Sequence, residues 1–315
     1  MSIIKASEPA YCRFQLPDLD RAEEFLTDFG LIAAGREGSR RYFRGTDPLP
    51  YCYVIEEGPE RFLGFALQAK SREDLDVLAS ATGKVVEAIE GLGGGVRVRL
   101  QEPNGYDVDI VYGLEPVAPI EVPRQAYNSV AQPNARANEL YRLKKGEPTP
   151  VRRLAHVVLG TPIVEETIAW FKQTLGFLSS DDIVVGPEKK LFGSFMRIDE
   201  GDKHVDHHTT FVIQNESAGL NHVSFEVQDI DAVLQDYHFL KSKGRYEHVW
   251  GIGRHLLGSQ VYDYWADPFG YIHEHWADSD RLTADIPTNV YEPQVGMVSQ
   301  WGEPTPQRMR EAVKA

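Results

Sequence analysis

The stretch PFGYIHEH, residues 268–275, has a counterpart in the first half of the chain, PNGYDVDI at residues 103–110. Both stretches are typical of a turn followed by a strand, and the pair Gly-Tyr stands at the same place in each. Such a correspondence over a long separation indicates an internal repeat. The residues that precede each stretch test this interpretation.

The repeat extends backwards from these two stretches through a full set of predicted elements. Each half begins with a strand and a helix, which is closed by a glycine. A second strand and helix follow before the final turn. The matched elements are the strands 11–16 and 154–159, the helices 20–29 (stopped at Gly30) and 165–175 (stopped at Gly176), the strands 62–69 and 220–227, and the helices around 74–79 and 229–240.

This order predicts an α+β fold of tandem duplicated βαβββ modules, in which each domain is a curled mixed sheet around a cavity. Residues 1–115 are expected to form the first domain and 151–280 the second. Six prolines mark 116–150 as a linker. The tail, 281–315, either folds over the cavity of the second domain or packs on another subunit, and the sequence does not decide between these.

Composition restricts the classes of partner. A formal net charge of −14 argues against nucleic acids and anionic membranes as binding partners, because both bind basic protein surfaces. No run of eighteen apolar residues and no signal-peptide pattern occurs, so a cytoplasmic protein is expected. The two cysteines, Cys12 and Cys52, are expected to be buried free thiols.

The histidines are distributed unevenly, since all ten lie between His156 and His275. Two of them, His156 and His222, stand with Glu274 on three separate predicted strands. Two imidazoles and one carboxylate can hold one face of a divalent metal and leave the other face open, as in non-haem Fe(II) oxygen chemistry. The aligned positions of the first half hold Arg13, Gly64 and Asp109, so metal is expected in the C-terminal domain only.

Two segments add a more specific signal, GLNHVSF at 219–225 and GIGRHLLGSQVYDYWADPFGYIHE at 251–274. They resemble extradiol catechol dioxygenases of the vicinal oxygen chelate (glyoxalase/bleomycin resistance/dioxygenase) superfamily. The resemblance covers the two-domain plan and implies that His156, His222 and Glu274 bind the metal. Because side chains alternate along a strand, the flanking His273 and His275 are expected to point away from Glu274 and to lie outside the coordination shell.

The same resemblance assigns three catalytic residues by spacing. In the family a histidine precedes the glutamate by nineteen residues and a tyrosine by ten, which gives His255 and Tyr264 here. A further histidine precedes the second metal histidine by fourteen residues, which gives His208; a slip of one residue selects His207 instead. The aromatic residues Phe192, Phe195, Trp250 and Tyr291 are candidates for the wall of a ring pocket.

The resemblance implies extradiol cleavage of a small aromatic diol by O₂, with Fe(II) as cofactor and Mn(II) as a possible substitute. It also implies a homo-oligomer. Two alternatives stay open. A glyoxalase-like metal-dependent isomerase would need no O₂ and typically draws ligands from both paired modules, where Arg13 and Gly64 cannot serve. A non-catalytic binding protein of the same superfamily would have no reason to keep His255, Tyr264 and the metal triad.

Overall fold

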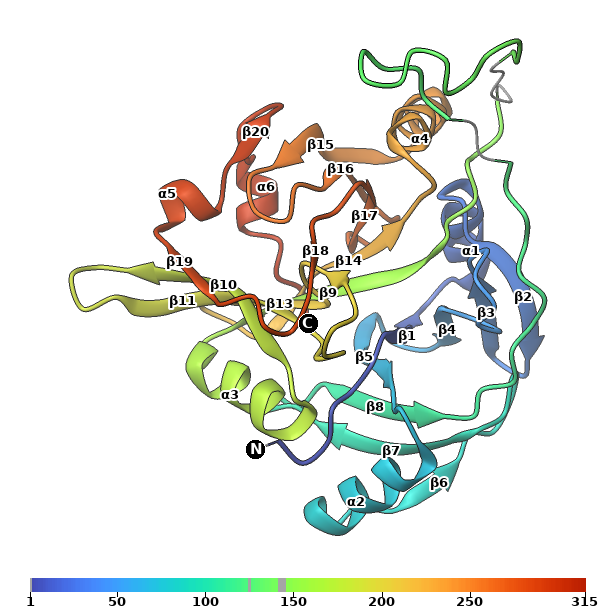
Figure 1. The fold of residues 1–315 in the computed structure, drawn as a ribbon. Coiled ribbons are helices and arrows are strands. Elements are labelled where there is room, and N and C mark those ends of the chain that lie inside the picture. Colours follow the sequence, from blue (N-terminus) through green and yellow to red (C-terminus); the bar gives the residue numbers. More distant parts are fainter. Residues whose placement is uncertain (1, 124–125, 141–145) are drawn as a thin grey trace.

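The computed structural model describes residues 2–123, 126–140 and 146–315. Its architecture consists of two large mixed sheets, one for each half of the chain, with the long helices outside the strands (Figure 1). Each sheet is built from two βαβββ modules, so the predicted α+β fold of duplicated modules is confirmed.

The first half supplies an eight-stranded sheet. Its first module contains β1 (Pro9–Leu16), α1 (Leu19–Asp28), β2 (Ile32–Glu37), β3 (Arg40–Arg44) and β4 (Tyr53–Glu57), and its second contains β5 (Arg61–Gln68), α2 (Arg72–Thr82), β6 (Val86–Ala88), β7 (Val96–Gln101) and β8 (Asp107–Tyr112).

The second half supplies a ten-stranded sheet. Its first module contains β9 (Arg153–Thr161), α3 (Val164–Leu175), β10 (Leu178–Val185), β11 (Lys190–Arg197), the short β12 (Val205–Asp206) and β13 (Thr210–Gln214), and its second contains β14 (Gly219–Glu226), α4 (Ile230–Lys243), β15 (Glu247–His255), β16 (Val261–Ala266) and β17 (Ile272–Ala277).

Both sheets join their modules in the same way. The first strands of the two modules lie side by side and antiparallel, β1 beside β5 and β9 beside β14. In each module the last long strand returns parallel to the first one, which places β17 beside β14 and β13 beside β9. Side chains of β9, β14 and β17 that point to one face of the sheet therefore converge at its centre.

The tail folds back on the second sheet. It consists of β18 (Arg281–Leu282), β19 (Asn289–Tyr291), α5 (Pro293–Gly296), β20 (Ser299–Trp301) and α6 (Gln307–Arg310). β19 pairs with β10 at one edge of the sheet and β20 pairs with β15 at the other. The chain between them thus crosses from edge to edge of the curled sheet, which answers the question that the sequence left open about this segment (Figure 1).

The local signals in the sequence have their expected structural counterparts. Gly176 caps α3 in the left-handed conformation, where the lack of a Cβ removes the steric cost. The described parts of 116–150 contain no helix or strand, and residues 124–125 and 141–145 of that predicted linker lie outside the described chain. None of the described helices combines the length and apolar character needed to cross a bilayer.

His273 and His275 join the two halves. Nε2 of His273 lies 3.0 Å from the Tyr53 hydroxyl, and Nε2 of His275 lies 2.7 Å from the carbonyl oxygen of Phe29, on whose ring it also stacks. Because successive side chains of β17 alternate faces, both point away from the face that carries Glu274. Burial lowers their pKa values to about 3 and about 4, so both rings stay neutral in this interface.

Candidate metal centre and cavity

The structure brings His156, His222 and Glu274 together at the centre of the second sheet. Nε2 of His156 lies 3.0 Å from Oε2 of Glu274, and Nε2 of His222 lies 3.5 Å from the same oxygen. One ligand atom from each residue falls within 4.8 Å of the others, and all three side chains are buried. The strands that carry them, β9, β14 and β17, are neighbours in the sheet.

The polar atoms of this cluster fit a divalent cation. His222 Nε2 and Glu274 Oε1 are buried and have no hydrogen-bond partner among the described residues, which is costly unless something binds them. Asn221 Oδ1 lies 2.7 Å from His222 Nδ1 and can only accept a hydrogen bond, so His222 Nδ1 carries the proton. The lone pair of His222 is therefore on Nε2, the nitrogen that faces Glu274, and the set of two nitrogens and one carboxylate suits Fe(II) or Mn(II).

Charge is balanced within the cluster. Burial alone would raise the pKa of Glu274, but the neighbouring imidazoles of His156, His222 and His255 hold it well below its usual range. Burial lowers the pKa of His156, and the Glu274 carboxylate offsets only part of that effect. Ser224 Oγ donates a further hydrogen bond to Glu274 Oε2. The site therefore presents an ionised carboxylate beside a neutral imidazole, which is the protonation state that a metal requires.

The three predicted catalytic residues surround the triad. Nε2 of His255 lies 2.9 Å from the Tyr264 hydroxyl and 3.7 Å from Glu274 Oε1. Burial raises the pKa of Tyr264 well above its ordinary value and the Glu274 charge raises it further, so the phenol stays protonated. The ring centre of His208 lies 4.2 Å from that of His156. Burial lowers the pKa of His208 well below its ordinary value.

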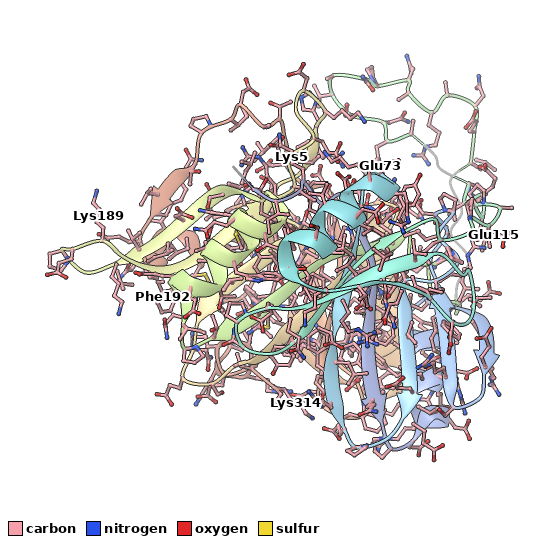
Figure 2. All side chains as sticks on the ribbon, turned by 90° about the horizontal axis from the view of Figure 1, so that it is seen from below. Lys5, Glu73, Glu115, Lys189, Phe192 and Lys314 are labelled. Atoms are coloured by element: carbon pink, nitrogen blue, oxygen red, sulfur yellow. The ribbon has the colours of Figure 1, made fainter. Side chains whose placement is uncertain are left out.

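A cavity of about 400 Å³ opens beside this cluster, a volume within the range of small-molecule sites. Five of the six residues predicted for the site line it, and the sixth, Glu274, lies fully buried next to them. Its walls are mostly apolar side chains of the sheet and the tail. They include Val158, Phe192 (labelled on β11 in Figure 2), Phe195, Phe211, Ile213, Trp250, Leu257, Pro293, Met297 and Met309.

The tail and the candidate aromatic residues have clear positions around this cavity. Pro293, Met297 and Met309 make the tail one wall of the cavity. Phe192, Phe195 and Trp250 also line it, as the sequence suggested. Tyr291 is not among its lining residues and lies on the edge strand β19.

His207 and His208 take different positions. His208 lines the cavity, whereas His207 does not and instead places Nε2 2.7 Å from Asp181 Oδ2. The sequence pattern missed Asn221, Ser224 and Asp181, which contact the predicted residues. Asn221 and Ser224 flank His222 at one and two residues, so proximity was the available signal; Asp181 lies on another strand and gives none.

The first sheet shows which residues stand at the equivalent positions in the first half. Ala66 and Ser224 are equivalent, because each pairs with the acidic residue on the last strand of its module. Ser224 also pairs with His156, and Ala66 with Tyr11. Tyr11, not Arg13, therefore occupies the place of His156. Tyr11 and Arg13 lie two residues apart on one strand and point to the same face, so the alternation of side chains does not reveal the two-residue offset.

Position 64, which corresponds to His222, has no room for a metal-binding side chain. A Cβ on Gly64 would lie 1.9 Å from the carbonyl oxygen of Asp107, and its φ of +142° disfavours other residues. Asp109, in the place of Glu274, is balanced by cations instead. Its carboxylate accepts hydrogen bonds from Arg99 Nε at 2.8 Å and Arg97 at 3.3 Å. An ion-pair cluster thus stands where the second half has its candidate metal ligands.

Comparisons with known proteins found similar sequences. Residues 153–274 match the model of the Glyoxalase/Bleomycin resistance protein/Dioxygenase superfamily, a range that ends on Glu274. Metapyrocatechase 2 from Cupriavidus necator is 26% identical over 298 residues, covering 93% of this chain and 88% of that protein. Manganese-dependent 2,3-dihydroxybiphenyl 1,2-dioxygenase from Geobacillus genomosp. 3 is 25% identical over 266 residues, 80% of this chain and 78% of that protein.

Solved structures share the whole fold. The Mn(II)-bound glyoxalase from Novosphingobium aromaticivorans has a TM-score of 0.79 at 23% identity, covering 96% of this chain and 94% of that one. Homoprotocatechuate 2,3-dioxygenase from Brevibacterium fuscum, in complex with 3,4-dihydroxyphenylacetate, has a TM-score of 0.77 at 22% identity, covering 99% of this chain and 94% of that one. At these identities the likeness establishes the fold.

Proposed function

We propose, from the match of residues 153–274 to the model of the Glyoxalase/Bleomycin resistance protein/Dioxygenase superfamily, that this chain is an extradiol ring-cleavage dioxygenase. It would open a catecholic ring beside its two adjacent hydroxyls and place both atoms of O₂ in the product. The observation that carries the proposal is the convergence of the triad with His208, His255 and Tyr264 on one apolar cavity.

His156, His222 and Glu274 would hold the metal, which we propose is Fe(II), with Mn(II) as the alternative. The bound cation would supply a Lewis acid that makes catechol oxygens easier to deprotonate. The orphaned atoms His222 Nε2 and Glu274 Oε1 support this assignment, because both need a partner that the described protein atoms do not provide.

The chain's own residues would position the ring and move protons. Tyr264 stays protonated in its buried place and can donate to a substrate oxygen on which charge develops. His255, in contact with that hydroxyl, can fix its orientation or hold a substrate proton. His208 is neutral when buried, so it can accept a proton when the diol binds and return it as the ring opens.

The walls of the cavity favour an uncharged ring substituent. Among the described residues that line it, Arg310 alone carries a permanent charge, and its guanidinium already donates to the Thr305 carbonyl oxygen. A carboxylate on the substrate would lose water among apolar side chains without a dedicated cation. We therefore propose catechols with alkyl or aryl substituents as the substrate class.

Two further parts of the proposal concern the protein in its cell. A cytoplasmic location is supported by two free buried thiols, Cys12 and Cys52, which suit a reducing compartment. Homo-oligomer formation is supported by exposed apolar residues of the tail, namely Val290, Val295, Val298 and Trp301. Light scattering of the purified chain at several concentrations tests the second point.

Reconstitution tests the proposed function. The purified chain is loaded with Fe(II) or Mn(II) without oxygen and then mixed with O₂ and a panel of catechols, while oxygen uptake and a yellow ring-fission product are recorded. We expect uptake that depends on both metal and catechol. A metal-loaded protein that isomerises a substrate without consuming O₂ would favour a glyoxalase-like activity, and a chain that binds no metal would favour a binding protein.

A further inference from the structure

A chain of polar side chains leads from His208 to residues that do not line the cavity. Nδ1 of His208 lies 3.1 Å from Nδ1 of His207, and Nε2 of His207 lies 2.7 Å from Oδ2 of Asp181. The other oxygen of Asp181 accepts a hydrogen bond from Asn289 Nδ2 at 2.9 Å. Both histidines and Asp181 are buried, so these contacts are shielded from water.

The ring of His207 is held firmly in this chain. Its backbone N–H donates to the Asp280 carbonyl oxygen at 3.0 Å, and its own carbonyl oxygen accepts from Ser180 Oγ at 2.6 Å. Gly258 packs against the ring, and a Cβ at that position would come within 3.0 Å of Nδ1. These contacts fix which atom each nitrogen of His207 faces.

Hydrogen-bond chemistry then decides where the protons lie. An ionised carboxylate only accepts, so Nε2 of His207 must carry a proton. With the His207 ring neutral, its Nδ1 has no proton and accepts a hydrogen bond from His208 Nδ1–H. Nε2 of His208 is consequently left with its lone pair on the cavity-lining ring.

We propose that Asp181, His207 and Asn289 are positioning residues that hold His208 in the Nδ1–H tautomer, with an unprotonated Nε2 available to the cavity. The inference rests on the proposed function for the role of His208. It means that the free enzyme is prepared to accept a proton from an arriving diol rather than to donate one. Second-sphere hydrogen bonds of this kind fix the tautomer and orientation of functional histidines.

Asn289 makes the proposal unusually testable. In Asp181→Asn the side chain keeps its shape, and while Asn289 keeps Nδ2 turned toward it, the new amide presents its oxygen to Asn289. Its NH₂ group then faces His207 Nε2 and donates to it. The proton of His207 moves to Nδ1, and the proton of His208 is forced onto Nε2, which is the opposite tautomer.

The double variant Asp181→Asn/Asn289→Asp should restore the original arrangement. The carboxylate at 289 accepts from the NH₂ group at 181, which turns the amide oxygen back toward His207 Nε2. β10 and β19 pair in the register that sets residue 181 opposite 289, so the two side chains stay within reach. A role for Asp181 in packing alone would not produce this rescue.

The direct readout is the ¹⁵N NMR spectrum of histidine-labelled, metal-free full chain, in which the two tautomers have distinct ring-nitrogen shifts. Comparison with His208→Phe assigns the resonances of His208. We expect Nδ1–H in the natural protein, Nε2–H in Asp181→Asn and Nδ1–H again in the double variant. Nε2–H at His208 in the natural protein would overturn the proposal, whatever the variants do.

The kinetic readout uses the metal-loaded enzyme and its preferred catechol. We expect Asp181→Asn to lower kcat about 10- to 100-fold with KM and metal content unchanged, and the double variant to recover most of the loss. Unaltered kcat in Asp181→Asn, or a double variant as slow as the single one, would refute the inference. Failure of the natural protein to cleave any catechol would instead refute the proposed function and leave the tautomer measurement standing.

Discussion

Replacement of Asp109 by asparagine should destabilise the first half strongly without affecting the metal site. Asp109 is fully buried and accepts hydrogen bonds from the Tyr11 hydroxyl at 2.9 Å, Arg99 at 2.8 Å and Arg97 at 3.3 Å. Asparagine keeps the shape, removes the charge and turns a donor toward groups that are donors themselves. The arginines are then left with no balancing carboxylate at that point.

The magnitude follows from the burial of the partners. Breaking a buried ion pair by removing one partner costs about 3–5 kcal/mol. The side chains of Arg97 and Arg99 are 19% and 33% exposed, so water can partly solvate them in the variant. We therefore expect a loss of stability at the lower end of that range, about 3 kcal/mol. The exposed pair Arg72–Asp76 provides a matched control, for which Asp76→Asn should cost less than about 1 kcal/mol.

The effect should depend on pH with a definite sign. Burial would raise the pKa of Asp109, but the hydrogen bond from Arg99 and the charges of Arg13, Arg99 and Arg97 lower it below its ordinary value. A carboxyl whose pKa is lower in the folded state contributes stability above its unfolded pKa of about 3.8 and loses it as the pH falls through the folded value. The difference in the free energy of unfolding between the natural protein and Asp109→Asn should therefore become smaller in acid.

Urea unfolding followed by far-UV circular dichroism between pH 7 and pH 3 measures this gap. Metal content serves as the internal control and should be unchanged, since the cluster lies in the first sheet. A loss below about 1 kcal/mol at pH 7, or a gap that widens as the pH falls, would refute the reasoning about the ion-pair cluster.

Three further predictions are independent of that cluster. Ser224→Ala removes a donor to Glu274 and should weaken metal affinity about 10- to 100-fold in a chelator competition, whereas the exposed Ser217→Ala should not; equal affinities would contradict the role of Ser224. Burial raises the pKa of Cys52 to about 12 and that of Cys12 well above its usual value, so neither thiol should react with an alkylating reagent at pH 8 until urea is added. An alkylcatechol should exceed a carboxylated catechol at least about tenfold in kcat/KM, and a preference for the acid would show that a cation such as Arg310 binds the substrate carboxylate.

Much of the fold could be predicted because it is repeated. The strand and helix order of one half predicts that of the other, and a single module has only a few ways to pair its strands. The tail could not be placed, because β19 and β20 have three residues each and owe their pairing to the edges they meet. Propensity carries little information over so short a segment.

The candidate site was predictable where its residues lie on regular strands. His156, His222 and Glu274 follow from strand pairing, and the structure brings them within 4.8 Å of one another. The equivalence of Arg13 with His156 was wrong by two residues, because a slip of two residues along a strand keeps the side chain on the same face and alternation does not reveal it. Which of His207 and His208 lines the cavity could not be predicted, because both lie in the loop before β13 and a loop has no regular alternation of side chains.

The central claim is that one buried carboxylate completes a metal site at which O₂ and a catechol react. The measurement that tests it most directly is parallel metal analysis and oxygen uptake for the natural chain and Glu274→Gln, each loaded with Fe(II) without oxygen. We predict about one bound metal and catechol-dependent uptake for the natural chain, and loss of both in the variant. Catechol-dependent oxygen uptake by a Glu274→Gln protein that holds no metal would contradict the claim.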